Sequence, residues 1–423
     1  MGFAQGVSGL NASSNELDVI GNNIANSGTV GFKTGSVQFA DVYAGSRVGL
    51  GTQVASVAQN FTQGALKSST RPLDVAITNG DGFFRLASAG GELSYSRNGQ
   101  FNMDKNGFIV NAAGMQLTGF QVGANGSIAG GSPTALQLPT TAMAPNPTGA
   151  ITAQFNLDSR STVPTKTPFD ANDSTTYNYS SAVTIFDSLG NSHELSTFFV
   201  KTTPSTANTW DVYATADGQP LATSGMFAPA PPAPGSNGTP IGSVAFDTSG
   251  ILVPPTPPAT GLLSITGLNF ANGSSPMTFD MDITGTTQFG NANDVKKLIQ
   301  DGYTSGTLTA YAINPDGTVS GKYSNEQAKT LGQVVLSSFA NPNGLQPKGD
   351  NAWAETDASG QPLTGTPGSG TKVGALTSGA LETSNVDLTS ELVNLIIAQR
   401  TYQANAQTVK TQDQVMQTLV NMR

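Results

Sequence analysis

The chain has 423 residues, of which 11% are charged, whereas about a quarter of the residues carry a charge in a typical soluble protein. Its net charge is −9 and its lysines and arginines are not clustered, which argues against nucleic-acid binding through phosphate neutralisation. It has no cysteine, so disulfides, thiolate metal sites and cysteine nucleophiles are excluded. With 49 glycines and 24 prolines, the composition is typical of short strands joined by many turns.

The N-terminus lacks the pattern of a secretory signal. The residues MGFAQGVSGLNASSNELDV contain no basic segment followed by an apolar core. Elsewhere, no apolar run approaches the roughly 20 residues that a membrane-spanning helix needs. We therefore expect no membrane insertion, and we expect any export to use a route that does not read such a signal.

The first expected element is a helix of about 22 residues with one narrow stripe along it. Glycines at 28 and 31 are expected to end this helix, and the residues from 29 to 70 are expected to form an extended linker with short strands. The stripe follows alternating spacings of three and four residues. Its members are Val7, Leu10, Ser14, Leu17, Gly21 and Ile24.

Short β-strands are expected from Arg71 onward. Segments such as LDVAIT and GFFRLA have the composition and length of strands, and Asn98-Gly99 and Asn106-Gly107 are typical hairpin turns. Two prolines, at 145 and 147, mark a boundary in the chain. The strands that follow, between residues 146 and 302, are expected to form an inserted β-region.

The last 39 residues, 385–423, contain no glycine or proline and are expected to form one long helix. Asn385 or Asp387 can cap its start. Spacings of four and three then alternate without a break, which is typical of a coiled-coil seam. The seam positions are Leu388, Leu392, Leu395, Gln399, Tyr402, Ala406, Val409, Asp413, Met416 and Val420.

The two terminal helices are expected to pair. The alternative is that the C-terminal helix packs on its own β-domain, but packing on a sheet favours a wider face with a period of 3.6 residues. The N-terminal helix carries the same repeat as the C-terminal one. Further apolar residues flank both seams, so we expect other copies of the chain to cover them: Val19, Ile20, Val393, Ile396 and Ile397.

Both ends of the chain resemble the bacterial flagellar rod and hook family. LDVIGNNIANSGTVGFK (17–33) is similar to the N-terminal signature of that family, and residues 385–423 are similar to its C-terminal helix. Between them, LDVAITNGDGFFRL, YSRNGQF, NAAGMQLTGF and YSNEQAKTLGQVVLSSFANPNGL resemble the hook members. The chain length and the inserted region favour a hook subunit over the shorter rod subunits. The signature residues are Asn22, Asn23, Ala25, Asn26, Gly31, Phe32 and Lys33.

The resemblance implies a mainly β fold with terminal α-helices, in a subunit of a curved hollow tube that acts as a universal joint between motor and filament. It also implies a division of the chain into four parts. These are a coiled-coil-like inner domain (1–28 plus 384–423), an extended linker (29–70 plus 376–383), a discontinuous β-domain (71–145 plus 303–375) and an inserted outer β-domain (146–302).

The resemblance also implies the partners of the chain. They are further copies of itself, the distal rod protein, the hook cap protein, the hook–filament junction protein, the hook-length ruler protein and the flagellar type III export apparatus. The implied location is the extracellular hook of the flagellum, reached without a cleaved signal. No cofactor, metal or catalytic residue is implied.

Other interpretations are weaker. A distal rod-type axial protein is the nearest alternative, and an adhesin-like secreted β-protein would not need the terminal heptads. Asp280 and Asp282 lie on one face of a strand and could form the carboxylate pair of a hydrolase. Charged residues that keep a sheet edge soluble explain the same pattern more simply. NMDKNGFI (102–109) imitates a calcium loop, yet its twelfth position is Ala113 rather than glutamate, which favours a hairpin. The single histidine, His193, is expected on the surface.

Overall fold

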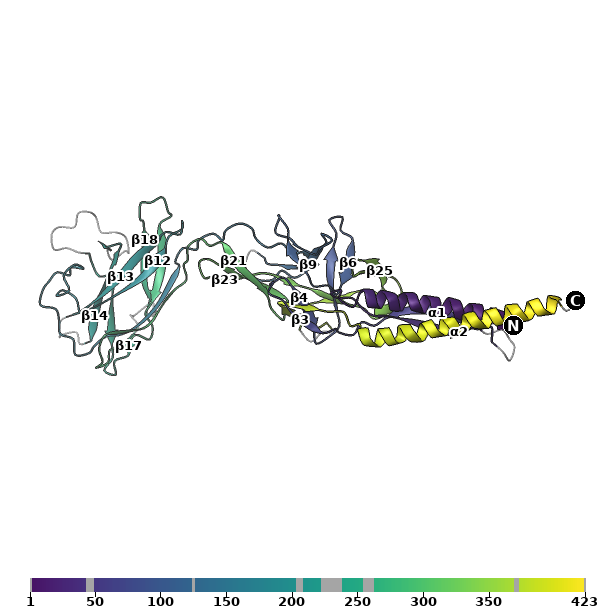
Figure 1. Ribbon diagram of the computed structural model, residues 1–423. Helices are drawn as coiled ribbons and strands as arrows, with labels where there is room; N and C mark the ends of the chain where they lie inside the picture. Colours follow the sequence, from purple (N-terminus) through teal and green to yellow (C-terminus); the bar gives the residue numbers. More distant parts are fainter. Residues whose placement is uncertain are drawn as a thin grey trace. The chain divides into compact units, whose positions relative to one another are not determined.

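The computed structural model describes residues 2–42, 49–123, 126–202, 208–221, 238–253, 262–368 and 373–421 (Figure 1). These residues form two compact units. The first unit consists of Met1–Thr140, Leu308–Lys322 and Ala328–Arg423, and the second of Thr141–Thr307 and Tyr323–Gln327. The chain therefore leaves the first unit, builds the second, and returns.

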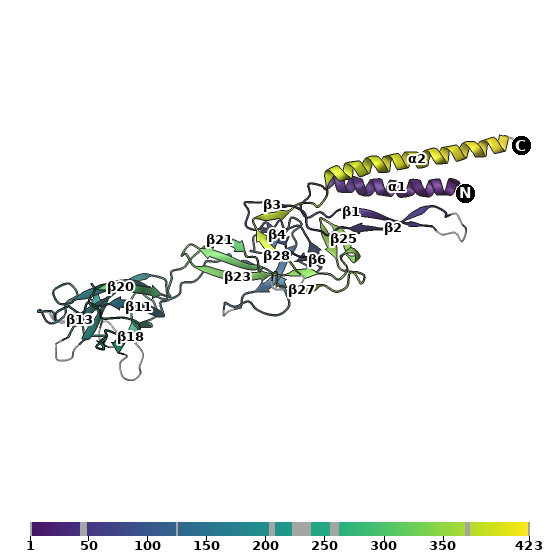
Figure 2. The ribbon, with the colours of Figure 1, turned by 90° about the horizontal axis from the view of Figure 1, so that it is seen from below.

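The terminal helices α1 (Gly2–Ala25) and α2 (Leu388–Asn421) lie side by side in the first unit (Figures 1 and 2). The α2 helix begins after Asp387, whose carboxylate accepts hydrogen bonds from the backbone N–H groups of Thr389 at 2.9 Å and Ser390 at 3.3 Å. This is the N-cap arrangement that acidic residues favour. Of the two expected caps, Asp387 is therefore the one used.

A hairpin of β1 (Gly35–Asp41) and β2 (Thr52–Gln59) packs along α1 on the side away from α2 (Figure 2). The segment expected as an extended linker with short strands (29–70) thus contains a hairpin that packs on the helix. The reason is a period-two pattern that places apolar residues such as Val37, Phe39 and Val54 on one face of the hairpin.

The incoming and outgoing arms of the chain pair with each other beside the helices. β3 (Leu66–Ser68) pairs with β29 (Ala380–Glu382), and β4 (Val75–Thr78) pairs with β28 (Ala375–Ser378), both antiparallel. Residues about 300 positions apart in the sequence are therefore hydrogen-bonded neighbours at the base of the helical pair.

The remainder of the first unit is a sheet of 13 described strands. An aromatic cluster of Phe83, Tyr95, Phe339 and Trp353, with Phe61 against it, fills its core through edge-to-face contacts. The main strand order is β21 (Leu308–Ile313), β22 (Thr318–Tyr323), β23 (Ala328–Val334), β9 (Gln116–Gln121), β5 (Phe83–Ala87), β6 (Leu93–Ser96), β26 (Ala352–Ala354) and β25 (Gln346–Gly349). Short additions are β7 (Asn102–Met103), β8 (Ile109–Val110), β10 (Thr134–Ala135), β24 (Leu336–Ser338) and β27 (Leu363–Gly365), and a 3-10 turn spans Pro342–Gly344.

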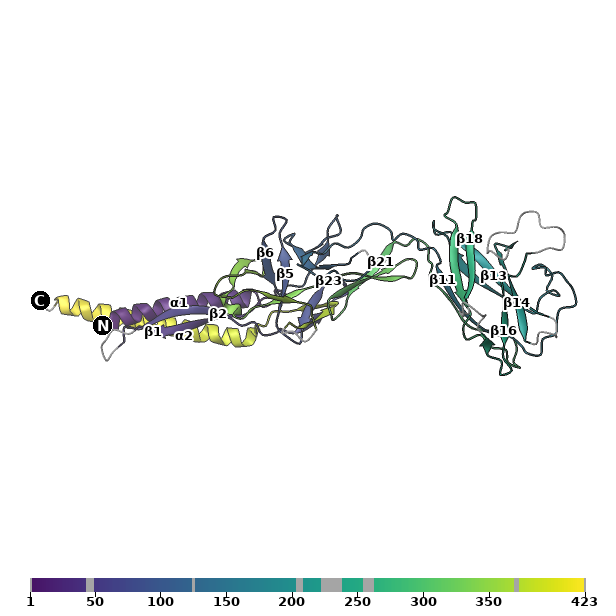
Figure 3. The same ribbon diagram turned by 180° about the vertical axis from the view of Figure 1, so that it is seen from behind.

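The second unit contains two sheets around one apolar core (Figure 3). Trp210 and Phe199 from one sheet, and Phe155, Ile265 and Phe279 from the other, are buried in that core. One sheet has the order β12 (Tyr179–Phe186), β13 (Ser192–Lys201), β14 (Thr209–Ala216), β16 (Gly242–Phe246) and β17 (Leu252–Val253), with β15 (Gln219–Pro220) beside β14. The other has the order β18 (Leu262–Leu268), β19 (Met277–Asp282), β11 (Ala150–Asn156) and β20 (Asp294–Gln300).

The structure resolves three smaller questions from the sequence. Residues 102–110 form the expected hairpin, in which β7 pairs with β8. Asp280, one of the two carboxylates considered for a hydrolase pair, accepts a hydrogen bond from Ser264 on the neighbouring strand. The expectation that His193 lies on the surface is wrong: its side chain is 9% exposed, because it stacks on Phe270 and is held by two carboxylates.

Candidate assembly site at the paired termini

The two helices pack tightly against each other at two glycines of α1. A Cβ atom on Gly6 would lie 2.8 Å from Val409 Cγ2, and one on Gly9 would lie 2.7 Å from Asn405 Nδ2. Larger residues at these positions would push the helices apart. The sequence pattern did not single out Gly6 or Gly9, because neither position falls on the three-and-four spacing of the predicted stripe.

The face of α2 that packs against α1 differs from the predicted seam. Ala398 and Glu391 are buried, and Leu395, Asn405 and Val409 are partly buried. The heptad spacing is present, but small and polar residues occupy part of it because the helices approach so closely. Several predicted seam residues are instead largely exposed in the single chain: Leu388, Leu392, Tyr402, Met416 and Val420.

On α1, the predicted stripe is only half covered. Val7, Leu10, Leu17 and Ile24 are partly buried, whereas Ile20, which was expected to flank the stripe, is buried. The cause is that α1 has neighbours on two sides, α2 and the hairpin, so its contacts are spread around the helix rather than confined to one stripe.

The C-terminal end of α2 extends past α1. The two helices have 34 and 24 residues, and Gly6 near the start of α1 lies beside Val409. The residues beyond Gln412 therefore have no α1 alongside them (Figure 2). Val415, Met416 and Val420 in this overhang are 48%, 60% and 71% exposed.

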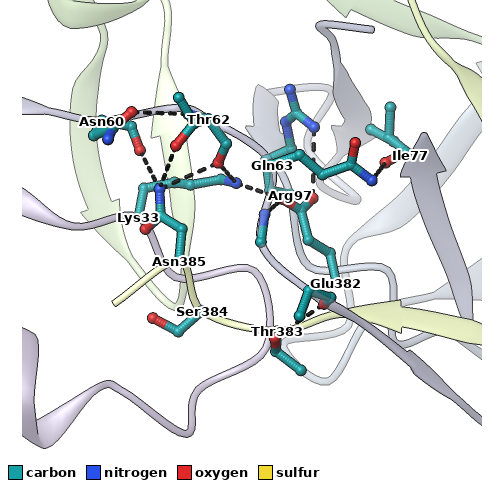
Figure 4. A network of polar contacts seen from close by, with 12 residues as sticks. Lys33, Asn60, Thr62, Gln63, Ile77, Arg97, Glu382, Thr383, Ser384 and Asn385 are labelled. Atoms are coloured by element: carbon teal, nitrogen blue, oxygen red, sulfur yellow. Dashed lines mark hydrogen bonds and ion pairs between the residues drawn. The ribbon is translucent and has the colours of Figure 1, made fainter. Parts of the chain in front are cut away.

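A buried ion cluster lies at the base of the helices (Figure 4). Lys33 Nζ contacts Glu382 Oε1 at 2.5 Å and donates a hydrogen bond to the carbonyl oxygen of Thr62 at 2.8 Å. A guanidinium nitrogen of Arg97 lies 3.5 Å from the other oxygen of Glu382. All three charged side chains are at most 2% exposed. One carboxylate thus holds two cations from distant parts of the chain.

Burial governs the electrostatics of this cluster. Loss of solvent lowers the pKa of Lys33, and the attraction of Glu382 opposes that effect. Burial likewise lowers the pKa of Arg97, against the attraction of Glu382 and Asp81. Because removing one partner would leave an uncompensated buried charge, the cluster ties the three segments together firmly.

Asparagines hold the surrounding turns. Asn23 Nδ2 donates to the carbonyl of Gly35 at 2.8 Å, and the N–H of Gly35 donates back to Asn23 Oδ1 at 2.9 Å. Asn385 Oδ1 accepts from the backbone N–H of Thr34 at 2.8 Å, and its Nδ2 donates to the carbonyl of Asn60 (Figure 4). The asparagine-rich end of α1 therefore fixes the turn into the hairpin.

The structure also places the other residues of the predicted signature. Gly31 is buried with φ of +72°, and a Cβ there would lie 2.6 Å from the backbone nitrogen of Asn98. Phe32 is partly buried, Asn26 bonds back to Asn22, and Ala25 is exposed. Glu382 and Arg97 were missed, because no local pattern connects a residue to a partner 349 positions away.

Two other kinds of site are absent from the part of the chain that the structure describes. Within the described ranges, no helix is both long and apolar enough to cross a membrane. Across the same part of the chain, histidine, aspartate and glutamate side chains form no group of three or more that could hold a metal ion.

Four segments of the chain match known protein families. The matched families are described as "Flagella basal body rod protein" (residues 5–33), "Flagellar hook protein FlgE/F/G D1 domain" (76–162), "Flagellar basal body protein FlaE D2 domain" (156–303) and "Flagellar basal body rod FlgEFG protein C-terminal" (377–422).

Relatives match over the full length. The chain is 48% identical over 426 residues to the flagellar hook protein FlgE of Salmonella typhimurium, with 100% of each chain covered. It is 47% identical over 432 residues to the flagellar hook protein FlgE of Escherichia coli, again with 100% of each covered. A crystal structure of Helicobacter pylori flagellar hook protein FlgE2 aligns with a TM-score of 0.49 and 14% identity, covering 75% of this chain and 100% of that one. By its full-length identity to these relatives, the chain belongs to the flagellar hook protein family.

Proposed function

We propose that this chain polymerises through its paired termini into a curved hollow tube, which acts as a universal joint between the rod and the filament of a bacterial flagellum. The observation that carries the proposal is the apolar surface that α2 leaves uncovered. Leu388, Leu392, Ile396 and Ile397 are each about half exposed, although they lie on the most regular helix of the chain. In a soluble monomer such a surface is a liability, whereas in a polymer it is an interface.

The assembly residues that we propose lie on both helices. Those of α1 are partly covered within the single chain, and those of α2 are largely free for neighbours. The proposed set is Val7, Leu10, Leu17 and Ile24 of α1, and Leu388, Leu392, Leu395, Tyr402, Val409, Met416 and Val420 of α2.

The proposed surroundings follow from membership of the hook family. At its ends the tube would contact the distal rod protein, the hook cap protein and the hook–filament junction protein. The export apparatus and the hook-length ruler protein would act before and during assembly. We place the chain outside the cell and, within the tube, the terminal helices innermost and the second unit outermost.

Electron microscopy of the purified chain tests the proposal. Protein is concentrated, sedimented and examined by negative stain. The expected result is a pellet of hollow tubes with uniform diameter. Monodisperse monomers that never sediment at any concentration or salt would contradict a polymer and would favour a binding role for the β-units.

A further inference from the structure

The exposed apolar side chains of α2 fall into two groups at opposite ends of the helix. The first group, which we call the α2 ridge, has five side chains that are 45–57% exposed: Leu388, Leu392, Val393, Ile396 and Ile397. The second group belongs to the overhang beyond Gln412 and consists of Val415, Met416 and Val420. Each group exceeds the scattered single apolar residues that are normal on a soluble protein.

The apolar face of the overhang continues the contact between α1 and α2. Val409 is partly buried, and a Cβ on Gly6 of α1 would lie 2.8 Å from its Cγ2. Met416 and Val420 follow Val409 at the heptad spacings of seven and then four residues, which places all three on one face of α2. Because α1 does not run alongside the overhang, this face extends beyond its partner (Figure 2).

The surface between the ridge and the overhang is mainly polar. Among the described residues of the two helices, Tyr402 is the one large apolar side chain exposed in this stretch. The exposed polar side chains there include Arg400, Gln403, Gln407 and Lys410 of α2, and Asn11, Asn15, Asp18 and Asn22 of α1. Another copy that covers either apolar group of α2 therefore finds its apolar counterpart in the other group.

The ridge and the overhang match in length and in charge. The ridge spans residues 388–397 and the described overhang residues 413–421, which correspond to about 15 Å and about 14 Å of helix. Each stretch contains one charged residue. Glu391 is buried, and Asp413 lies where the overhang begins, before its first apolar residue. The two apolar surfaces can therefore pack on each other without burying an unpaired charge.

Symmetry determines how copies can use these surfaces. A two-fold pair would bury the overhang of one copy against the overhang of the other and leave both ridges exposed. Contact between the overhang of one copy and the ridge of the next covers both surfaces, and it repeats from copy to copy. Because the two surfaces lie at opposite ends of one helix, the repeated contact produces a row of copies along the direction of α2.

We propose that the overhang of one copy packs on the α2 ridge of the next copy, so that the α2 helices form continuous rows through the polymer. This proposal rests on the polymer proposed above and names the contact that joins its subunits along the helix direction. The end of α2 that has no partner within its own chain is accordingly the part that binds the neighbouring copy.

Disulfide cross-linking tests the contact without background, because the chain has no cysteine. Val420→Cys is combined with Leu388→Cys, Leu392→Cys or Ile396→Cys, which lie one turn apart and sample three registers, and assembled protein is oxidised with copper phenanthroline. Within one chain, residues 396 and 420 are separated by about 36 Å of helix, whereas a disulfide needs Cα atoms about 4–7 Å apart. Any bond therefore joins two copies.

The expected result is a ladder of species larger than a dimer from at least one double variant, and little cross-linking from the single variants. Tubes of all three double variants that give no species beyond a dimer would overturn the proposal. Strong dimer formation by Val420→Cys alone would also overturn it, because the overhangs would then pack on each other. If Val420→Cys prevents sedimentation, Met416→Cys takes its place.

A matched control separates this contact from chance collision. The pair Val420→Cys with Gln407→Cys uses an exposed residue of the polar stretch, about 16 Å along the helix from residue 396. An equal ladder from this pair would overturn the proposal. Failure of the unmodified chain to form any tube is a different outcome, because it rejects the polymer itself.

Discussion

Among single residues, Glu382 connects three separate segments of the first unit. Its carboxylate is buried between Lys33 and Arg97, and one of its oxygens also accepts the N–H of Gly64 at 2.9 Å. It therefore joins the end of α1, the first β-segment and the arm that leads to α2. Removal of Lys33 or Arg97 breaks one ion pair and leaves the other intact. Removal of the Glu382 carboxylate breaks both ion pairs at once.

We expect Glu382→Gln to destabilise the first unit by about 3–5 kcal/mol, because it leaves two buried cations without a counter-charge. Lys33→Met should cost less, since the pair between Arg97 and the carboxylate survives. Unfolding in urea is followed by the fluorescence of Trp353 in a Trp210→Phe background, so that only the first unit reports.

An exposed ion pair serves as the control for that series. Lys348 and Glu92 form an ion pair on the surface of the first unit, where such pairs contribute little to stability. Glu92→Gln should leave the Trp353 transition almost unchanged. A loss for Glu382→Gln no larger than this would mean that the buried cluster is not a stabilising connection.

The stability of the second unit should depend on pH through Asp187. Burial alone would raise the pKa of this carboxyl, but hydrogen bonds from Asn191, Asn272 and His193 hold it well below its usual range. Because the folded pKa lies below the unfolded value of about 3.9, ionised Asp187 stabilises the fold above that value. The stabilisation is lost as the pH falls through the folded pKa.

Urea unfolding at pH 7 and pH 3 measures this effect through Trp210, in a Trp353→Phe background. The parent chain should lose more stability on acidification than Asp187→Asn, which has no carboxylate to protonate at this position. The same pH dependence in both proteins would assign the acid sensitivity to other groups.

Among the elements, the two helices could be predicted from the sequence, but the residues that form the contact between them could not. Spacing predicted α1 and α2 and their pairing, because periodicity is a local property of the sequence. The spacing of apolar residues did not reveal that Gly6 and Gly9 lie against Val409 and Asn405 of α2. Lys33 belongs to the predicted signature, but its partner Glu382 could not be predicted without knowing that the two arms of the chain pair.

We expect Leu392→Asp to abolish tube formation and to leave the α1–α2 pair intact. The side chain is 45% exposed in the single chain, so a carboxylate there stays hydrated until a neighbouring copy tries to cover it. Circular dichroism should report unchanged helix and strand content, and sedimentation should report a loss of pelletable protein.

The control for Leu392→Asp is Gln403→Asp, which adds the same charge at an exposed polar position of the same helix. It should assemble normally. Normal tubes from Leu392→Asp would show that this residue is not part of an interface, and failure of both variants would indicate a general effect of added negative charge.

On the scale of the whole molecule, the second unit is an insertion whose two ends are adjacent. The N–H of Asn146 donates to the carbonyl of Tyr303 at 3.0 Å, and the N–H of Tyr303 donates back at 2.9 Å. The boundary near residue 146 was predicted from two prolines, and the return was predicted at 302. The division into two compact units also includes residues 323–327 in the second unit, a contribution that no local sequence pattern indicated.

We expect deletion of residues 146–302, closed by a short Gly/Ser linker, to leave chains that still form tubes. The two ends already lie within hydrogen-bonding distance, so closure adds little strain, and the proposed assembly surfaces are all in the first unit. Electron microscopy should show tubes that are straighter or differently curved. A deletion variant that folds, judged by its Trp353 transition, but forms no tube would place the second unit in the assembly core.

The contact between Lys33 and Glu382 also bears on protein synthesis. During synthesis Lys33 is made long before the carboxylate that neutralises it, because 349 positions of the chain separate Lys33 from Glu382. Until then the turn after α1 has two cations to bury and no anion, so the nascent N-terminal half lacks its final ordering contact. A polypeptide released early by a nonsense codon carries the same defect permanently. We therefore expect a chain that stops before residue 382 to leave this turn without its final order.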